Sequence, residues 1–194
     1  EQIENIFFEK LNDFFARNDI SYDLKNLEKL WQNYVKGHFS TLRNVYRYLN
    51  ALQFRLPSIY TEINITDFLL LEIVRVFDHE AYEKIYVDNH SAAIYIGVLG
   101  YGKNKEKLDA FENENTRKIV KYLSNKPTLH YSLCKGSQDK SLFDRESFER
   151  YFALKLPSDN VSEKDIKLFI EGGENIDRVS LLNDINKYGR FENL

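Results

Sequence analysis

The stretch that decides the fold is "EINITDFLLLEIVRVFDHEAYEKIYVDN", residues 62–89. Asn64 can cap a helix here, and Asp67 three residues later resembles the acidic partner of a capping box. The helix that follows is apolar around most of its circumference, with Glu72 and Arg75 as the clear interruptions on one edge. Such a helix is usually the buried centre of a bundle. The residues that we expect to be almost fully buried are Leu70, Leu71, Ile73, Val74 and Phe77.

Helical spacing continues on both sides of this centre. It predicts helices over residues 2–17, 26–35, 41–56, 80–87, 105–124, 147–154, 162–171 and 175–188, and leaves one short strand open over 128–133. Gly37 is expected to end the second helix, and Pro57 the third. The fold class is therefore mainly α: a helical bundle over residues 1–124 and an α-rich, helical C-terminal extension over 125–194.

The composition excludes several classes of protein. Of the 194 residues 43% are hydrophobic and the formal net charge is -3, which is typical of a globular chain and disfavours disorder or strong polyanion binding. The longest aliphatic or aromatic run is far too short to span a membrane, so we expect no membrane segment. A single cysteine, Cys134, and the absence of a signal peptide favour the reducing cytoplasm. The chain contains no Met, even at its start, so we expect a fragment of a longer protein.

No catalytic or metal-binding motif is present in the sequence. The histidines His38, His79, His90 and His130 form no H-E-x-x-H pattern, so we expect no metal site. Cys134 lacks the surroundings of a catalytic nucleophile. The loop "GYGKNK", residues 100–105, lacks the second glycine and the hydroxyl that a phosphate-binding loop needs. We therefore expect no catalytic residues in this chain.

The helix that begins near Ser40 carries two different stripes. At about 100° per residue, Leu42, Val45, Leu49 and Leu52 fall on one side and are expected to pack into the bundle. A second, well-separated stripe consists of Arg43, Arg47, Asn50 and Phe54. This second stripe is either a solvated face with snorkelling arginines or half of an interface.

At this point the sequence resembles the region that follows the nucleotide-binding core in KAP-family P-loop NTPases. The family pattern is an aromatic residue, T-x-R-x-x-x-R-x-x-N, an acidic helix start, a hydrophobic helix ending in R-V-F, and Y-E-x-I. The matching positions are Phe39, Thr41, Arg43, Arg47, Asn50, Glu62, Asp67, Glu72, Arg75, Val76, Phe77, Tyr82, Glu83 and Ile85. The resemblance is specific over residues 39–89, although His79 stands where the family usually has proline.

The resemblance implies a helical lid or regulatory region of an ATPase, in a bacterial protein linked to antiphage defence. The phosphate cradle would lie upstream of Glu1 in the same chain, so the parent protein would bind ATP and magnesium while this chain alone would not hydrolyse ATP. It further implies that Arg43 reaches the γ-phosphate and that Arg47 and Asn50 support it. A guanidinium suits this role because its fork gives paired, charge-assisted hydrogen bonds. The expected partners are the ATPase core, a second copy of the protein or an effector protein.

Two alternatives use the same helix differently. In the first, the chain is a helical protein–protein interaction module that binds a partner through Arg43, Arg47 and its aromatic residues. In the second, nucleic acid contacts Arg43, Arg47, Arg55, Tyr46 and Tyr48, which the net charge of -3 disfavours. For Glu72 and Arg75, three residues apart on the polar edge of the helix, we expect a local ion pair with a structural role, worth only a few tenths of a kcal/mol if it is exposed.

Overall fold

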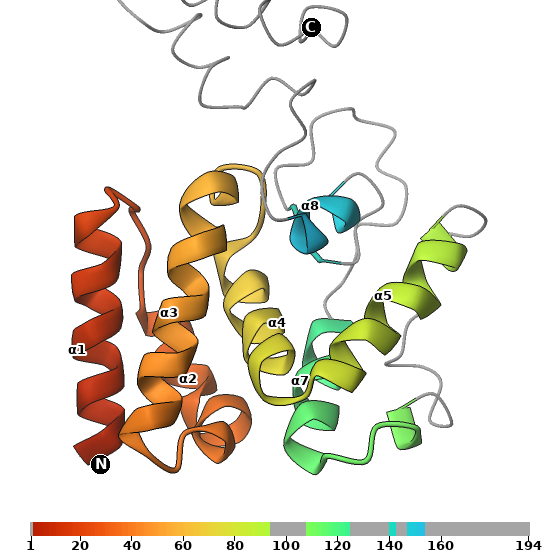
Figure 1. The fold of residues 1–194 in the computed structure, drawn as a ribbon, viewed down its shortest axis with the longest axis horizontal. Helices are drawn as coiled ribbons and strands as arrows, with labels where there is room; N and C mark the ends of the chain where they lie inside the picture. The colour runs from red at the N-terminus through yellow and green to blue at the C-terminus, as the bar shows by residue number, and fades with distance from the viewer. Residues whose placement is uncertain (1, 94–107, 125–139, 143–146, 154–194) are drawn as a thin grey trace, which may run out of the picture.

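The helix α4 (Ile65–Phe77) lies at the centre of the computed structural model, which describes residues 2–93, 108–124, 140–142 and 147–153. Every residue from Thr66 to Val74 is buried. Around α4 lie α3 (Leu42–Ile59), α5 (His79–Ala93) and α7 (Glu114–Ser124), as Figure 1 shows. The mainly α fold and the central position of residues 65–77 are confirmed, and the described residues contain no strand.

Two details of this central helix differ from the prediction. Asn64 caps it, since its Oδ1 accepts the amide hydrogen of Asp67 at 3.2 Å. The Asp67 carboxylate, however, does not complete a capping box: it is fully buried and accepts the amide hydrogen of Leu142 at 3.1 Å. Phe77, at the end of the helix, is only partly buried and not almost fully buried as expected, because the last turn reaches the edge of the bundle.

The N-terminal part of the chain packs along α3. The helix α1 (Gln2–Arg17) has the predicted bounds and lies beside α3 in Figure 1. Its buried Phe7 contacts the rings of Trp31, Phe39 and Tyr48, with centroids 4.8 to 5.8 Å apart. This aromatic cluster joins α1 to α3 and to the segment between them.

The second predicted helix is not one continuous α-helix. It consists of α2 (Lys25–Leu30), the π-helix η1 (Trp31–Val35) and the 3₁₀-helix η2 (Lys36–His38). Gly37 lies inside η2 and does not end a helix at that point. A Cβ at Gly37 would come within 2.5 Å of the Asn115 side chain, so the glycine permits α7 to approach closely.

The helix α3 continues past the proline that was expected to stop it. Pro57 lies inside the helix, which ends at Ile59, and the amide of Tyr60 still donates to the Leu56 carbonyl at 2.9 Å. Proline has no amide hydrogen, so the carbonyl of the residue four positions earlier in the helix loses its donor. That residue is Gln53, which is exposed, so water can hydrate its carbonyl. The expected end near residue 56 was therefore wrong by one turn.

The remaining described elements cover the other side of α4. Asn113 starts α7 by accepting the amide hydrogen of Asn115 at 2.9 Å on its side-chain oxygen. This cap begins a new helix at Glu114, so the prediction of a single helix over 105–124 was wrong. The short α8 (Phe148–Phe152) lies within the predicted 147–154. The expected helices over 162–171 and 175–188 and the open strand over 128–133 lie outside the described residues.

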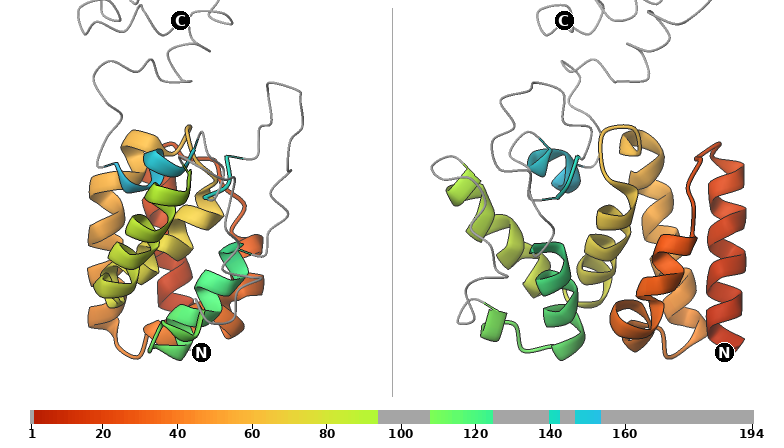
Figure 2. Two further views of the ribbon diagram at one scale, coloured as in Figure 1. Left: turned by 90° about the vertical axis from the view of Figure 1, so that its right-hand side faces the viewer. Right: turned by 180° about the vertical axis from the view of Figure 1, so that it is seen from behind.

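Among the described elements, none covers the side of α3 on which Arg43, Asn50 and Phe54 lie. In Figure 1 α3 lies at the front, and the views in Figure 2 place α2 and η1 behind it. The described parts of the predicted extension, 140–142 and 147–153, lie near α4, so the division at residue 124 stays a prediction. Among the described helices none is long and apolar enough to cross a membrane.

Candidate functional site

The first turn of α3 is held in place by polar contacts. Thr41, the N-cap, accepts the amide hydrogen of Asn44 on its Oγ1 at 3.3 Å. The Asn44 side chain donates to the His38 carbonyl at 3.0 Å, which ties the helix start to the preceding loop. Arg43 therefore projects from a helix start that is held by the Thr41 cap and by the contact of Asn44 with the preceding loop.

One line of α3 faces solvent. Arg43, Arg47 and Asn50 are exposed, and Phe54 is 80% exposed. These four residues lie within about 60° of the helix circumference and extend over about 16 Å. Tyr46, which is 49% exposed, lies at the edge of this line. We call these five residues the outer face of α3.

The opposite side of α3 is packed into the bundle. Val45, Leu49 and Leu52 are buried, as the stripe predicted. Leu42, the fourth member of that stripe, is 43% exposed, because it is the first residue of the helix and packing begins one turn later. The predicted separation of the two stripes is thus confirmed from Val45 onward.

The members of the outer face differ in what holds them. The Arg47 guanidinium lies over the Phe77 ring, 5.8 Å from its centroid, which fixes its direction toward the end of α4. The side chains of Arg43 and Asn50 make no hydrogen bond or ion pair with any part of the chain that the structure describes. Arg43 is thereby available to an external group.

The charge on the outer face is not balanced locally. The helix α3 contains no acidic residue over its 18 residues. Arg43 also lies in the first turn, where a cation opposes the positive end of the helix dipole. The helix dipole therefore makes the Arg43 cation slightly unfavourable for the stability of the chain alone. An anionic group bound at the guanidinium would remove this cost.

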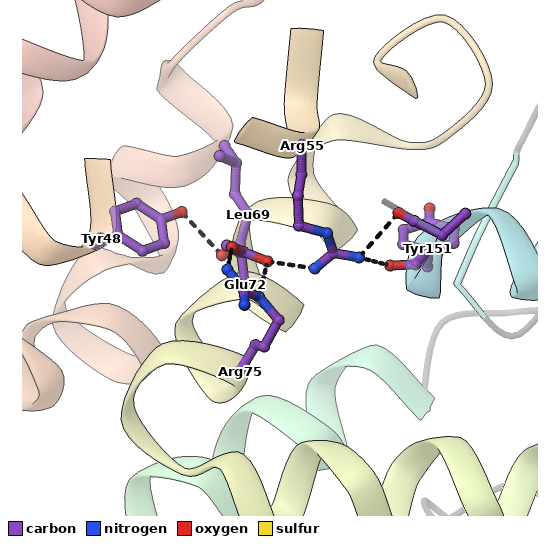
Figure 3. Close-up of polar contacts among 7 residues, drawn as sticks. Tyr48, Arg55, Leu69, Glu72, Arg75 and Tyr151 are labelled. Carbon is purple, nitrogen blue, oxygen red and sulfur yellow. Dashed lines mark hydrogen bonds and ion pairs between the residues drawn. The ribbon is translucent and has the colours of Figure 1, made fainter. Parts of the chain in front are cut away.

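The third arginine of the same helix, Arg55, has a different environment (Figure 3). Arg55 is 2% exposed and donates from Nη1 to the Glu72 carboxylate at 2.7 Å and from Nη2 to the Tyr151 carbonyl at 2.5 Å. Glu72 is fully buried and also accepts hydrogen bonds from Arg75. The predicted local pair of Glu72 and Arg75 is present, and Arg55 from α3 adds a further, buried partner that helical spacing did not predict.

The same geometry removes two residues from the proposed nucleic-acid surface. Arg55 is buried, and so is Tyr48, whose hydroxyl donates to the Leu69 carbonyl at 2.9 Å. Burial, together with the nearby Glu72 charge, raises the pKa of Tyr48 well above its ordinary value, so this phenol remains a donor. Of the five residues in that alternative, only Arg43, Tyr46 and Arg47 are exposed.

His38 is the buried titratable group nearest the start of α3. Desolvation lowers its pKa from 6.5 to about 4, against the opposing effect of the Asp78 charge. Its Nε2 is buried without a hydrogen-bond partner among the described atoms. His38 is therefore neutral at pH 7, and its ring packs against the Phe77 ring, with the two centroids 5.7 Å apart.

The described residues contain no cluster of histidine, cysteine or acidic side chains that could hold a metal ion. The side chains of His90, His130 and Cys134 and the loop over 100–105 lie outside the described part of the chain.

Tyr46 was not predicted as part of the stripe of Arg43, although its wheel angle, about 60° from Arg43, could have placed it there.

Comparisons with known proteins add no identification. No protein-family model, curated protein or solved structure that was compared matches this chain. The resemblance to KAP-family NTPases over residues 39–89 stays a prediction that those residues alone carry.

Proposed function

We propose that this chain is a helical docking domain that covers the nucleotide-binding core of a KAP-like P-loop ATPase. The observation that carries the proposal is the outer face of α3, a solvent-exposed line that includes two arginines and a phenylalanine on a helix whose other side is packed into the bundle. In this proposal Arg43 lies nearest the γ-phosphate of ATP, and Arg47 and Asn50 contact the core beside it. ATP and magnesium are bound by the core, which lies in the same protein.

The chemistry of Arg43 supports this placement. A phosphate oxygen supplies the anion that the first turn of α3 favours, and the guanidinium fork can bind it with two hydrogen bonds. Phe54, 80% exposed, is then covered by an apolar part of the core. Loss of the γ-phosphate on hydrolysis removes the anion and releases the domain. The cytoplasm and a role in antiphage defence belong to the same proposal and rest on the resemblance alone.

The test is the steady-state ATPase activity of the full-length protein with Arg43→Ala. We expect turnover to fall about 100-fold, on the scale of removing one preorganised donor, with ATP binding retained. Arg43→Lys should recover little of it, because an ammonium does not reproduce the fork. The matched control is Arg17→Ala, an arginine at the end of α1 that is 77% exposed. Wild-type turnover in Arg43→Ala would overturn the proposal.

A second candidate function is a protein–protein interaction module without nucleotide. The observation that favours it is the apolar exposure around the same face, where Leu42, Tyr46 and Phe54 are 43%, 49% and 80% exposed. Binding of a protein partner that Phe54→Ser abolishes, and that is the same with and without ATP, would favour this module. Dependence of that binding on ATP would favour the docking domain.

A further inference from the structure

Phe77, the last residue of α4, lies between the outer face of α3 and the aromatic core. Its side chain is partly buried, and the Arg47 guanidinium of the outer face lies over its ring, 5.8 Å from the centroid. A cation over the face of an aromatic ring is attracted by the ring quadrupole. An exposed arginine of α3 is thus held by a ring that belongs to another helix.

The other contacts of Phe77 fix the position of its ring. The ring of Phe39 meets it edge-to-face, with 5.3 Å between the centroids, and the ring of His38 lies 5.7 Å away. Phe39 is 3% exposed and contacts three further rings of the aromatic cluster that joins α1 to α3. The surface under Arg47 is therefore supported by the folded core.

Arg43, one turn earlier on the same face, has no such support. Among the described residues, its side chain has no hydrogen bond, no ion pair and no aromatic ring beneath it. Two cations four residues apart on one helix repel each other. The Phe77 ring attracts one of these two cations, so the Arg47 guanidinium has a preferred direction that the Arg43 guanidinium lacks.

We propose that Phe77 is a positioning residue of the outer face, which holds the Arg47 guanidinium in place before the ATPase core docks. The identity of the partner rests on the proposed function. Ordering a long side chain at an interface costs conformational entropy, and a side chain that is already held has lost much of that entropy beforehand. Phe77 therefore makes docking at Arg47 more favourable, whereas Arg43 becomes ordered only when it meets its anion.

The incomplete burial of Phe77 fits this role. Ile73 and Val74, one turn earlier in α4, are fully buried and so cannot be reached by an exposed cation. A ring that supports an exposed arginine has to lie at the edge of the bundle, which is where α4 ends.

The competing explanation is that the aliphatic stem of Arg47 covers an apolar patch while its charge stays in water. Such packing needs an apolar neighbour but no aromatic face, so leucine at position 77 would serve as well as phenylalanine. Positioning through the ring needs the aromatic face, which tyrosine keeps and leucine lacks. Phe77→Leu and Phe77→Tyr therefore separate the two explanations.

The first experiment measures side-chain order in this chain without nucleotide. Nitrogen-15 relaxation at the Nε of Arg47 and of Arg43 reports the motion of each guanidinium on the picosecond-to-nanosecond timescale. In the wild type we expect Arg47 to be the more ordered of the two, and equal order would overturn the proposal without any variant. Phe77→Leu should lower the order of Arg47 to that of Arg43, whereas Phe77→Tyr should retain it. Retained order in Phe77→Leu, or lost order in Phe77→Tyr, would contradict the proposal.

The second experiment measures the steady-state ATPase activity of the full-length protein. Phe77→Leu should lower turnover about two- to fivefold, the factor that corresponds to one cation–π contact at an exposed site. The KM for ATP should stay unchanged, because the core binds ATP. In an Arg47→Ala background, Phe77→Leu should have no further effect, since the ring acts only through this arginine. An equal loss in both backgrounds would show that Phe77 acts through the stability of the fold and would overturn the positioning role.

The matched control is Phe8→Leu. Phe8 is another partly buried aromatic residue, in contact with the rings of Phe7 and Trp31, and no cation of the described residues lies over it. This variant should keep both turnover and the order of Arg47 at wild-type values. A loss as large as that of Phe77→Leu would mean that any defect in the aromatic cluster has the same effect, which would contradict the proposal.

Arg43→Ala distinguishes a failure of this inference from a failure of the proposed function. If Arg43→Ala lowers turnover and Phe77→Leu does not, the positioning role is wrong and the docking domain stands. Wild-type turnover in Arg43→Ala would overturn the docking domain, and the docking role of Phe77 with it, whatever the order of Arg47. Loss of turnover in both variants, with the Phe77→Leu effect absent once Arg47 is removed, is the result that the proposal predicts.

Discussion

Arg43 and Arg55 lie twelve residues apart on one helix and meet opposite environments. The Arg43 side chain is exposed and makes no hydrogen bond or ion pair with the described residues, whereas the Arg55 side chain is 2% exposed and donates to a carboxylate and two carbonyls. Residue type alone therefore does not separate an arginine that holds the fold from one available to a partner. The two environments differ in whether groups distant in sequence reach the guanidinium. Mutations around Arg55 should therefore lower the stability of the fold, whereas mutation of Arg43 should leave it almost unchanged.

The largest effect is expected for Glu72→Ala. This substitution leaves Arg55 buried without its carboxylate, and we expect the free energy of unfolding to fall by about 3–5 kcal/mol. Urea unfolding followed by Trp31 emission measures it. The control is Glu83→Ala, an exposed glutamate of α5, for which a change below about 0.5 kcal/mol is expected. Equal effects of the two substitutions would mean that the cluster around Arg55 does not stabilise the fold.

The pH dependence of stability tests the buried start of α3. Because the pKa of His38 is about 4 in the folded chain and 6.5 in the unfolded chain, the unfolded chain binds the proton first as the pH falls. Stability from this group is complete above pH 6.5 and declines toward pH 4, by up to about 3 kcal/mol in total.

Urea unfolding near neutral pH and again at about pH 5 measures this slope. His38→Phe should flatten the slope, since its apolar ring cannot be protonated. His79→Gln is the matched control, because His79 is 71% exposed, and it should keep the wild-type slope. A wild-type slope in His38→Phe would show that other groups cause the pH dependence.

A smaller effect separates two tyrosines of α3. Tyr48→Phe removes the hydrogen bond to the Leu69 carbonyl and should lower stability by about 1 kcal/mol. Tyr46→Phe, on the outer face, should change it by less than about 0.5 kcal/mol. Thermal melts of the two variants give the comparison, and a larger loss for Tyr46→Phe would reverse the assignment of the two sides.

The smallest effect is expected for Arg43→Ala in the isolated chain. Removing a cation from the first turn of α3 should raise stability by a few tenths of a kcal/mol. Such a gain, measured by denaturant unfolding, is expected for a residue kept for binding at a small cost in stability. A loss of more than about 1 kcal/mol would show instead that Arg43 supports the fold.

The sequence predicted what depends on neighbours along the chain. The apolar run of residues 68–74 predicted the buried centre, and Asn64 predicted the start of α4. The line of Arg43, Arg47, Asn50 and Phe54 was also readable, because helical spacing alone separates it from the packed side.

The contacts around α4 that the sequence did not predict involve groups distant in sequence. Glu72 pairs with Arg75 as expected, but Arg55, 17 residues earlier, also donates to it and to the carbonyl of Tyr151, 96 residues after Arg55. Asp67 was expected to close a capping box, but it bonds Leu142, 75 residues later. Spacing along one helix cannot predict such contacts, because they depend on how separate segments pack.

The central claim, that the outer face of α3 is a docking surface, is tested most directly by hydroxyl-radical footprinting of Phe54. The side chain is 80% exposed in this chain, so its oxidation rate here is the reference. In the full-length protein with ATP bound, we predict that oxidation of Phe54 falls at least about fivefold as the core covers it, while that of Phe7, fully buried in α1, stays low in both. Equal oxidation of Phe54 in the chain alone and in the ATP-bound full-length protein would contradict the account.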